Sequence, residues 1–502
     1  MKKTFFRTFA MLMALLMLIL VCVACTGGGD DANTEGGVTT DPNGTDEGPK
    51  SAVDATGLEI RDYGGQTMNI WYSTKTTWKP YPLDVTLEDS NSGDIVISAG
   101  YQRNKVLESM LDIYIDYTES DTNPNKDPSD VAALRILFQA GDTDRYDIIM
   151  TGAKSASSLA KEGFYFDLNN SEYIHPDAYY YETQVNEQIQ LYGKQYFAAG
   201  YYSVMNTAAI DVTFVNYGIV EDNSHVTLTE MYQMAFDKTW TFEKMMTLGR
   251  TYATPTDNTG DYNTDKYALV LSANYAQNMF YDLGGTAVEY DDNLGDYVCT
   301  LDNTKNQELL GWINTNIADK DGSEITIQRN NMHDEAYLAQ SAPFMTTNFA
   351  VLWDIMESDL LWSIMPTPLK NEGDDYRSYS DAWNLNFAGI PSSCRDIDKA
   401  TYLYELFMAY SYDYVYPAYY EKCFQTRYQP DADSAQVFDM VAKSRFVCIA
   451  NIYGLMYDAQ GNEDLGIRRL CYLGTQEVGS TVEVTSGYIK TNLEALKKEV
   501  KQ

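Results

Sequence analysis

The chain has 502 residues, of which 44% are hydrophobic, and a formal net charge of −36 that comes from 72 acidic and 36 basic side chains. A surface of this sign repels nucleic acid and anionic lipid, so we expect no nucleic-acid partner. The length exceeds what a single hydrophobic core usually supports, and this predicts two domains.

The N-terminus has the pattern of an export signal. Basic side chains lie within the first seven positions and precede an apolar run over 10–20, which leads to Cys25. This run is too short for a comfortable membrane span and is typical of a cleaved signal. The arrangement resembles a bacterial lipoprotein, which implies a signal peptide over 1–24 and lipidation of Cys25. Cys22 departs from the Leu or Val usual at its position, and an uncleaved anchor helix is the alternative.

The next segment, 25–56, is rich in Gly, Asp and Thr. It cannot bury enough apolar surface to fold, which predicts a disordered tether. Because a single acyl chain holds a protein only weakly on a bilayer, stable anchoring implies more than one chain. We therefore expect the folded part on the extracytoplasmic face of the bacterial cell membrane, attached through lipid.

Strands and helices are predicted to alternate after the tether. Apolar, β-favouring runs predict strands at 68–72, 114–117 and 146–150, and helical spacing predicts helices at 101–113 and from 130 to 140. Two βαβ steps in succession predict a mostly parallel sheet with helices on both faces. In such sheets ligands bind beyond the carboxyl ends of the strands.

Four candidate ligand-binding residues lie at these strand ends. Thr151 and Gly152 follow the third strand and can offer backbone N–H groups. Trp71 and Tyr72 end the first strand, and their flat rings with polar edges suit the C–H face and hydroxyls of a sugar. Because neighbouring side chains in a strand point to opposite faces, one of these two rings is expected in the core.

Short motifs recur downstream in a fixed order. They are AGD at 140–142, YDII at 146–149, FDL at 166–168, TWT at 239–241, LGG at 283–285, APFM at 342–345, WSIMPTP at 362–368 and AGIP at 388–391. In this order, and together with the lipoprotein-like start, they resemble the bacterial extracellular solute-binding protein family 1, whose members deliver solutes to ABC importers.

The resemblance implies an α/β fold of the two-lobe periplasmic-binding-protein type (type II), with parallel-rich sheets flanked by helices and joined by a hinge. Carried over to this chain, the first lobe would comprise 57–165 and 335–368, and the second 166–334 and 369–502. A solute that binds the closed form better than the open form shifts the equilibrium toward closure. The family's partner is an ABC permease, and we expect a monomer without cofactor.

Three further ligand-binding candidates come from the resemblance. Tyr201 and Tyr202 lie in a segment similar to the family's approach to the second lobe. Trp383 precedes the AGIP motif, where the family commonly offers an aromatic ring to the ligand. Trp240, by contrast, is expected to pack at the start of a helix.

The favoured function is capture of a sugar or oligosaccharide for import. A receptor for a peptide or another metabolite, or one that reports to a sensor kinase, is the alternative. An extracellular glycoside hydrolase with two carboxylates is a third hypothesis, but no catalytic spacing supports it. The three histidines lie far apart and indicate no metal site, and the pairing of Cys299, Cys394, Cys423, Cys448 and Cys471 stays open.

Overall fold

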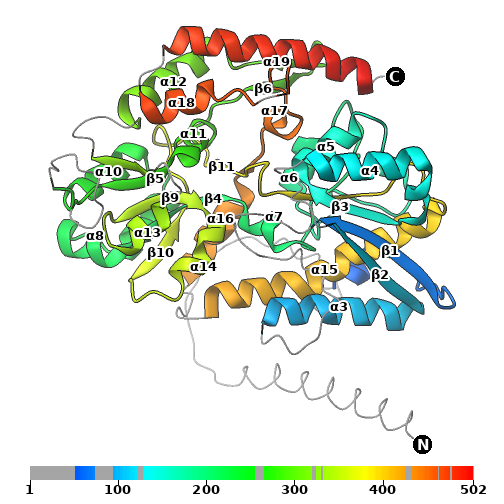
Figure 1. The fold of residues 1–502 in the computed structure, drawn as a ribbon. Coiled ribbons are helices and arrows are strands. Elements are labelled where there is room, and N and C mark those ends of the chain that lie inside the picture. The colour runs from blue at the N-terminus through cyan, green and yellow to red at the C-terminus, as the bar shows by residue number, and fades with distance from the viewer. Residues whose placement is uncertain are drawn as a thin grey trace, which may run out of the picture. The chain divides into compact units, whose positions relative to one another are not determined.

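Two β-sheets organise the folded unit in the computed structural model (Figure 1). The structure describes residues 51–73, 94–120, 128–254, 265–318, 324–328, 332–425, 432–461, 463–474 and 477–500. The first sheet has the strand order β12-β3-β1-β2, with β1 (Gln66–Ser73), β2 (Ile113–Ser120), β3 (Ile148–Gly152) and β12 (Asn386–Gly389). β1 is parallel to β2 and β3, which confirms the predicted parallel arrangement, and β12 is antiparallel to β3.

Side-chain alternation gives the first sheet two cores. Ile70 and Met150 pack in one core with α3 (Ile95–Leu111) and the first half of α15 (Ile397–Gln425). Trp71 and Ile149, the neighbours of those residues along the strands, pack in the other core with α4 (Pro128–Ala140) and α5 (Ala153–Ala160). Helices therefore cover both faces of this sheet, as predicted (Figure 1).

The second sheet has the order β10-β4-β9-β5-β8. Its strands are β4 (Asp211–Asn216), β5 (Leu269–Ser272), β8 (Ile325–Gln328), β9 (Phe344–Asn348) and β10 (Trp362–Met365). β5 is parallel to β8 and β9, whereas β4 is antiparallel to β9 and β10. The parallel trio places the carboxyl ends of three strands at one edge, where ligands gather in sheets of this kind.

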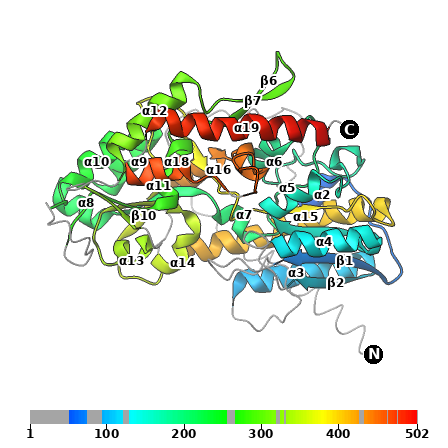
Figure 2. The ribbon, with the colours of Figure 1, turned by 45° about the horizontal axis from the view of Figure 1, so that its top comes forward.

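The other elements pack around these sheets. The helices are α2 (Ala52–Thr56), α6 (Thr183–Ile189), α7 (Val204–Ala208), α8 (Tyr217–Ser224), α9 (Leu228–Phe236), α10 (Phe242–Arg250), α11 (Ala273–Asp282), α12 (Thr304–Asn316), α13 (His333–Leu338), α14 (Leu352–Ile355), α16 (Ala432–Lys443), α17 (Ile449–Ile452), α18 (Gly466–Leu473) and α19 (Val478–Val500). The remaining strands are β6 (Val288–Asp291), β7 (Asp296–Cys299), β11 (Ser378–Tyr379) and β13 (Arg445–Phe446). Figure 2 shows α19 beside α12 and α18. Within the described ranges, no helix combines the length and apolar character needed to cross a bilayer.

Segments that contain α7, β11 and β13 connect the parts of the chain that pack on the two sheets. Ala198 bridges Ala388 at the edge of the first sheet, and α7 leads from there into β4. The connection from β10 back to β12 contains β11, which pairs in parallel with β13. Two of the crossing segments are thus hydrogen-bonded to each other between the sheets.

The strand pairing differs from the predicted lobe assignment. β9 and β10 lie within 335–368, which was assigned to the first lobe, yet they pair with strands of the second sheet. β12 lies within 369–502 and pairs with β3 of the first sheet, and Ala198 joins that sheet as well. The order of the motifs along the chain indicates where strands occur, but it does not indicate with which sheet each strand pairs. The exact lobe boundaries stay a prediction.

The end of the predicted tether is also folded. Residues 52–56 form α2, in which Ala52 is buried, and the Ala52 amide donates to the Asp413 carboxylate on α15 at 2.9 Å. Packing against α15 therefore orders a segment whose composition alone indicates disorder. Cys25 and the rest of 1–50 lie outside the described residues.

Candidate functional site

The first component of the candidate site lies at the carboxyl end of β3. Gly152 ends the strand, has extended backbone geometry and is the N-terminal cap of α5. β12 lies alongside in antiparallel register, with Asn386 opposite Gly152, and the Ala153 amide donates to the Leu385 carbonyl at 2.9 Å. This pairing brings Trp383, in the turn before β12, close to the first turn of α5.

Lys154 is the centre of a polar and aromatic group at this point, which we call the Lys154 cluster (Lys154, Asp381, Trp383, Tyr457 and Glu463). The Lys154 ammonium lies 3.4 Å from the centroid of the Trp383 ring and donates to the Tyr457 hydroxyl at 2.9 Å. It also forms an ion pair with Glu463 at 3.5 Å. A β-bridge between Tyr457 and Glu463 holds these two partners side by side.

Burial shapes the electrostatics of the Lys154 cluster. Desolvation lowers the pKa of Lys154, whereas the charges of Glu463 and Asp381 act in the opposite direction. Desolvation likewise raises the pKa of Asp381, against the hydrogen bond from the Trp383 amide and the charge of Lys154. The group therefore offers a cation, carboxyl oxygens and aromatic faces in a poorly hydrated setting, which suits binding of a hydroxylated ligand.

The second component lies at the carboxyl end of β5. Ser272 ends this strand and caps α11 by accepting a hydrogen bond from the Tyr275 amide at 3.5 Å. The Tyr275 ring packs 5.2 Å from the ring of His333, and its pKa is raised by burial and then by the charge of Asp211. Polar side chains from β4, α11 and α13 therefore meet at one edge of the second sheet.

Asp381 links the two components. Its charge contributes to the raised pKa of Tyr275 and to that of Asp211 on the second sheet, and it also acts on Lys154 beside the first sheet. On α18, Arg468 influences Asp381 electrostatically and donates to Asn274 on α11 at 3.0 Å. The charge of Asp381 is thus felt at the carboxyl ends of strands in both sheets.

Three of the residues predicted to bind ligand are brought together here. Thr151 and Gly152 end β3, and Trp383 lies on Lys154 next to them. Thr151 is fully buried, whereas Trp383 is half-buried. Trp383 is accordingly the predicted aromatic residue best placed for contact with a solute.

Two predicted residues belong to the cores, and these assignments are corrected. Trp71 is 3% exposed and packs against α4 and α5, because alternation turns it away from the face that Ile70 occupies. Tyr202 is fully buried, and its hydroxyl donates to the Asn386 carbonyl at 2.9 Å. Tyr72 is half-buried and contacts Tyr117 edge to face, with 5.7 Å between ring centroids.

Tyr201 lies in a different aromatic group. Its ring contacts Tyr416 at 4.5 Å and Tyr412 at 5.1 Å, both on α15. Burial raises its pKa, followed by the charge of Glu182. The structure therefore places Tyr201 with the crossing segments and not with the Lys154 cluster.

Sequence reasoning missed several residues of the site. Lys154 and Asp381 each lie within three residues of a predicted binding residue, Gly152 and Trp383 respectively, and a charged side chain so close to a candidate is a local signal. Tyr275 follows the end of a buried strand, which is the position that general rules for α/β sheets favour. Tyr457 and Glu463 carry no local signal, because only tertiary folding brings them to Lys154.

Other reactive groups do not gather into a site in the parts that the structure describes. No three His, Cys, Asp or Glu side chains there are placed to hold a metal ion. Cys299, Cys394, Cys448 and Cys471 are free thiols. Cys423 is outside the residues whose side chains are described.

Solved structures share this architecture over 86% of the chain. A cyclo/maltodextrin-binding protein complexed with maltotetraose matches over 98% of its own length, with a TM-score of 0.55 and 9% identity. The chain has the two-lobe fold of a substrate-binding protein. An ABC substrate-binding protein from Listeria monocytogenes in complex with cycloalternan matches over 99%, with a TM-score of 0.51 and 12% identity.

A third solved structure with the substrate-binding-protein fold is the GacH receptor of Streptomyces glaucescens, described without ligand and in complex with acarbose. It matches over 99% of its length, with a TM-score of 0.53 and 11% identity. Neither a family model nor a curated protein sequence matches the chain. The substrate-binding-protein fold nevertheless confirms the predicted fold class.

Proposed function

We propose that the protein is a lipid-anchored extracellular receptor that captures a sugar or oligosaccharide between two lobes and delivers it to an ABC import permease. The observation that carries this proposal is the likeness of nearly the whole folded unit to binding proteins whose structures contain maltotetraose, cycloalternan or acarbose. The lipid anchor rests on the N-terminal sequence pattern, and the permease on the resemblance to family 1.

The Lys154 cluster supports a carbohydrate as the solute. Sugar hydroxyls can donate to carboxylates and accept from an ammonium group, while a C–H face packs on an aromatic ring. The Lys154 cluster supplies all three partners within one group. These side chains would contact the sugar directly. The lobes would close because the sugar makes more favourable contacts with the closed form than with the open form.

The first prediction concerns ligand-dependent stability. The thermal midpoint of the purified chain should rise with at least one oligosaccharide from a panel that contains maltotetraose, cycloalternan and acarbose. At one hundred times its dissociation constant, a ligand adds about 2.7 kcal/mol to the free energy of unfolding. Amino acids and short peptides complete the panel. A shift with peptides alone would remove the sugar assignment, and release of shortened products would indicate a hydrolase instead.

The second prediction concerns Trp383. Trp383→Ala should weaken binding of the sugar that shifts the midpoint by about tenfold, because it removes the aromatic face of the Lys154 cluster. Calorimetric titration measures the change. Tyr114→Ala is the matched control, since Tyr114 is a 66% exposed ring on β2 and its loss should leave the affinity unchanged. Equal affinities of the Trp383 variant and the unaltered protein would exclude Trp383 from the site.

A further inference from the structure

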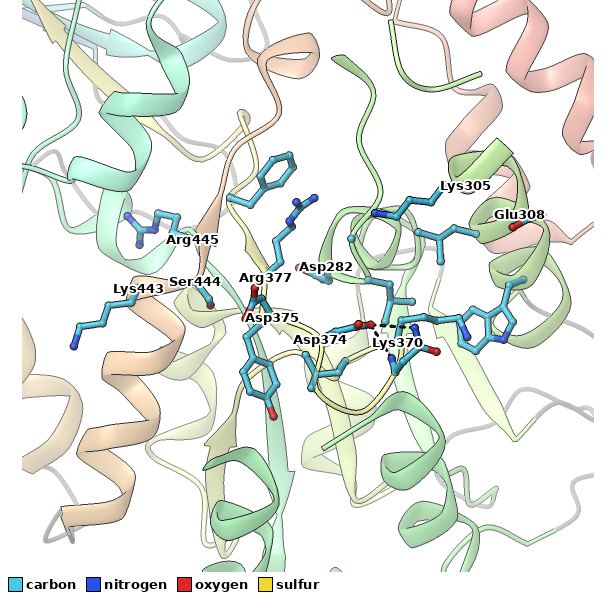
Figure 3. A pocket seen from close by; sticks show the side chains of 18 of the residues that line it. Asp282, Lys305, Glu308, Lys370, Asp374, Asp375, Arg377, Lys443, Ser444 and Arg445 are labelled. Atoms are coloured by element: carbon cyan, nitrogen blue, oxygen red, sulfur yellow. Dashed lines mark hydrogen bonds between the residues drawn. The ribbon is translucent and has the colours of Figure 1, made fainter. Parts of the chain in front are cut away.

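A cavity lies beside α12 and the connection between β10 and β11. Its volume is about 810 Å³, within the range of small-molecule sites (Figure 3). The walls come from the end of α11, from α12, from the connection between β10 and β11, and from β13, with Gln188 of α6 at the edge. A molecule bound here would contact the segments that join the two sheets.

Two cations face each other across this cavity. Lys305 reaches in from α12 and Arg377 from the connection before β11, and Figure 3 shows both head groups turned toward the same space. In the described part of the chain, neither forms a salt bridge within 4.0 Å. Arg377 is held in place by donation to the Gly285 carbonyl at 3.0 Å and by packing of its guanidinium 4.3 Å from the centroid of the Phe446 ring. In a chain of net charge −36, such a pair is a local exception.

Three of the acidic residues that line the cavity make no ion pair with Lys305 or Arg377. Asp374 accepts hydrogen bonds from the backbone and side chain of Asn371, and Asp375 pairs with Lys238 at 2.6 Å. Glu308 lies farther along α12, beyond Lys305 in Figure 3. Asp374 and Asp375 thus have partners outside the space between the two cations, whereas the charges of Glu289 and Asp282 act on Arg377 and partly balance its charge.

A buried carboxyl group forms part of the wall beneath the cations. Asp282 is 4% exposed, and its Oδ1 accepts from the Tyr379 amide at 2.8 Å. Its Oδ2 is buried without a hydrogen-bond partner among the described residues. Burial raises the pKa of Asp282 to about 8, so the protonated carboxyl can donate a hydrogen bond at neutral pH. The charge of Asp282 also raises the pKa of buried Asp211, so the two carboxyl groups act on each other behind the cavity wall.

We infer that this cavity is a second ligand site, which binds a small organic or inorganic anion through a carboxylate or phosphate group held between Lys305 and Arg377. Charge-assisted hydrogen bonds to carboxylate and phosphate are the strong contacts of both side chains. The site is separate from the Lys154 cluster, and its ligand need not be a sugar.

Calorimetric titration of the purified full chain at low ionic strength tests the inference. Citrate and inorganic phosphate serve as separate probes that distinguish carboxylate from phosphate recognition, and glycerol is the neutral comparison. We expect saturable binding of at least one anion and none of glycerol. Lys305→Gln should weaken the binding about tenfold, the effect of one charge-assisted hydrogen bond. Lys305 is exposed, so this variant should keep the thermal midpoint of the unaltered protein.

Lys244→Gln is the matched control, because it removes the same charge from an exposed position on α10 outside the cavity. Its anion affinity should equal that of the unaltered protein. The inference fails if neither anion binds saturably, if glycerol binds as well as the anions, or if the two lysine variants lose affinity equally. None of these outcomes would affect the proposed capture of a sugar at the Lys154 cluster.

Discussion

Replacement of Arg445 by methionine is expected to lower the free energy of unfolding by about 3–5 kcal/mol, because it leaves a buried carboxylate without its cation. Arg445 on β13 forms a 2.8 Å ion pair with Glu182, and both side chains are less than one-tenth exposed. The same guanidinium donates to the Thr207 carbonyl at 3.0 Å, and the Thr207 hydroxyl donates to Glu182 at 3.1 Å. This pair therefore connects two crossing segments with the residues before α6.

Urea unfolding followed by circular dichroism measures the loss. The matched control is Arg395→Met, which breaks an ion pair with Asp144 in which the arginine is 75% exposed. An exposed pair of this type contributes no more than about 1 kcal/mol. The double variant Glu182→Gln with Arg445→Met should recover part of the loss. Equal losses for the two arginine variants would show that burial does not increase the contribution of the Arg445 pair.

Asp282→Asn is expected to make the protein more stable than the unaltered chain at alkaline pH. Burial raises the pKa of Asp282 in the folded state to about 8, against the smaller opposing effects of the Tyr379 amide and Arg377. Asparagine keeps an oxygen that accepts from the Tyr379 amide but carries no titrating proton. It therefore removes the cost of ionising a buried carboxyl group.

The direction of the pH dependence follows from proton linkage. Between the unfolded pKa near 4 and about 8, the folded protein holds a proton that the unfolded chain has released, so this contribution to stability falls as pH rises. At about 1.4 kcal/mol per pKa unit, the variant should gain up to about 5 kcal/mol over the unaltered chain by pH 9, and little near pH 4.

Unfolding measurements at pH 5, 7 and 9 check this prediction. Asp211→Asn should change the slope in the same direction, because burial and the charge of Asp282 raise the pKa of Asp211 well above its usual range. A difference between Asp282→Asn and the unaltered chain that stays constant across these pH values would contradict the account.

The early part of the fold was predictable because its signals are local. β1, β2 and β3 each contain a short β-favouring run, and Gly141, with a φ of 77°, follows the end of α4 at the predicted place. Pairing over long distances was not predictable in the same way. β12 has the same apolar character whether it joins one sheet or the other, and only packing decides between them.

In the candidate site, too, residues with local sequence signals were predictable and residues joined only by long-range contacts were not. Trp383 is a candidate because it lies next to a strand in a recognisable motif, and its role in binding stays a prediction. Alternation predicted that one of Trp71 and Tyr72 is buried, but the strand pattern does not tell which one. Trp312 has no local signal that marks it as a cavity residue, yet it is half-buried beside the cavity near Lys305, with Lys370 3.9 Å from its ring centroid. Contacts between distant segments, such as Lys154 with Tyr457, depend on folding as a whole.

Because β12 pairs with the first sheet, that sheet can be completed only with residues that follow the second sheet in the chain. Every strand of the second sheet lies between Asp211 and Met365, so that sheet can assemble from one continuous stretch. The first sheet, in contrast, needs β12 and α15, which follow all strands of the second sheet in the chain. Without β12 and α15 the apolar faces of the first sheet would be partly uncovered, and such exposed surfaces favour aggregation. A chain cut before residue 386 would therefore hold a complete second sheet beside an unfinished first one.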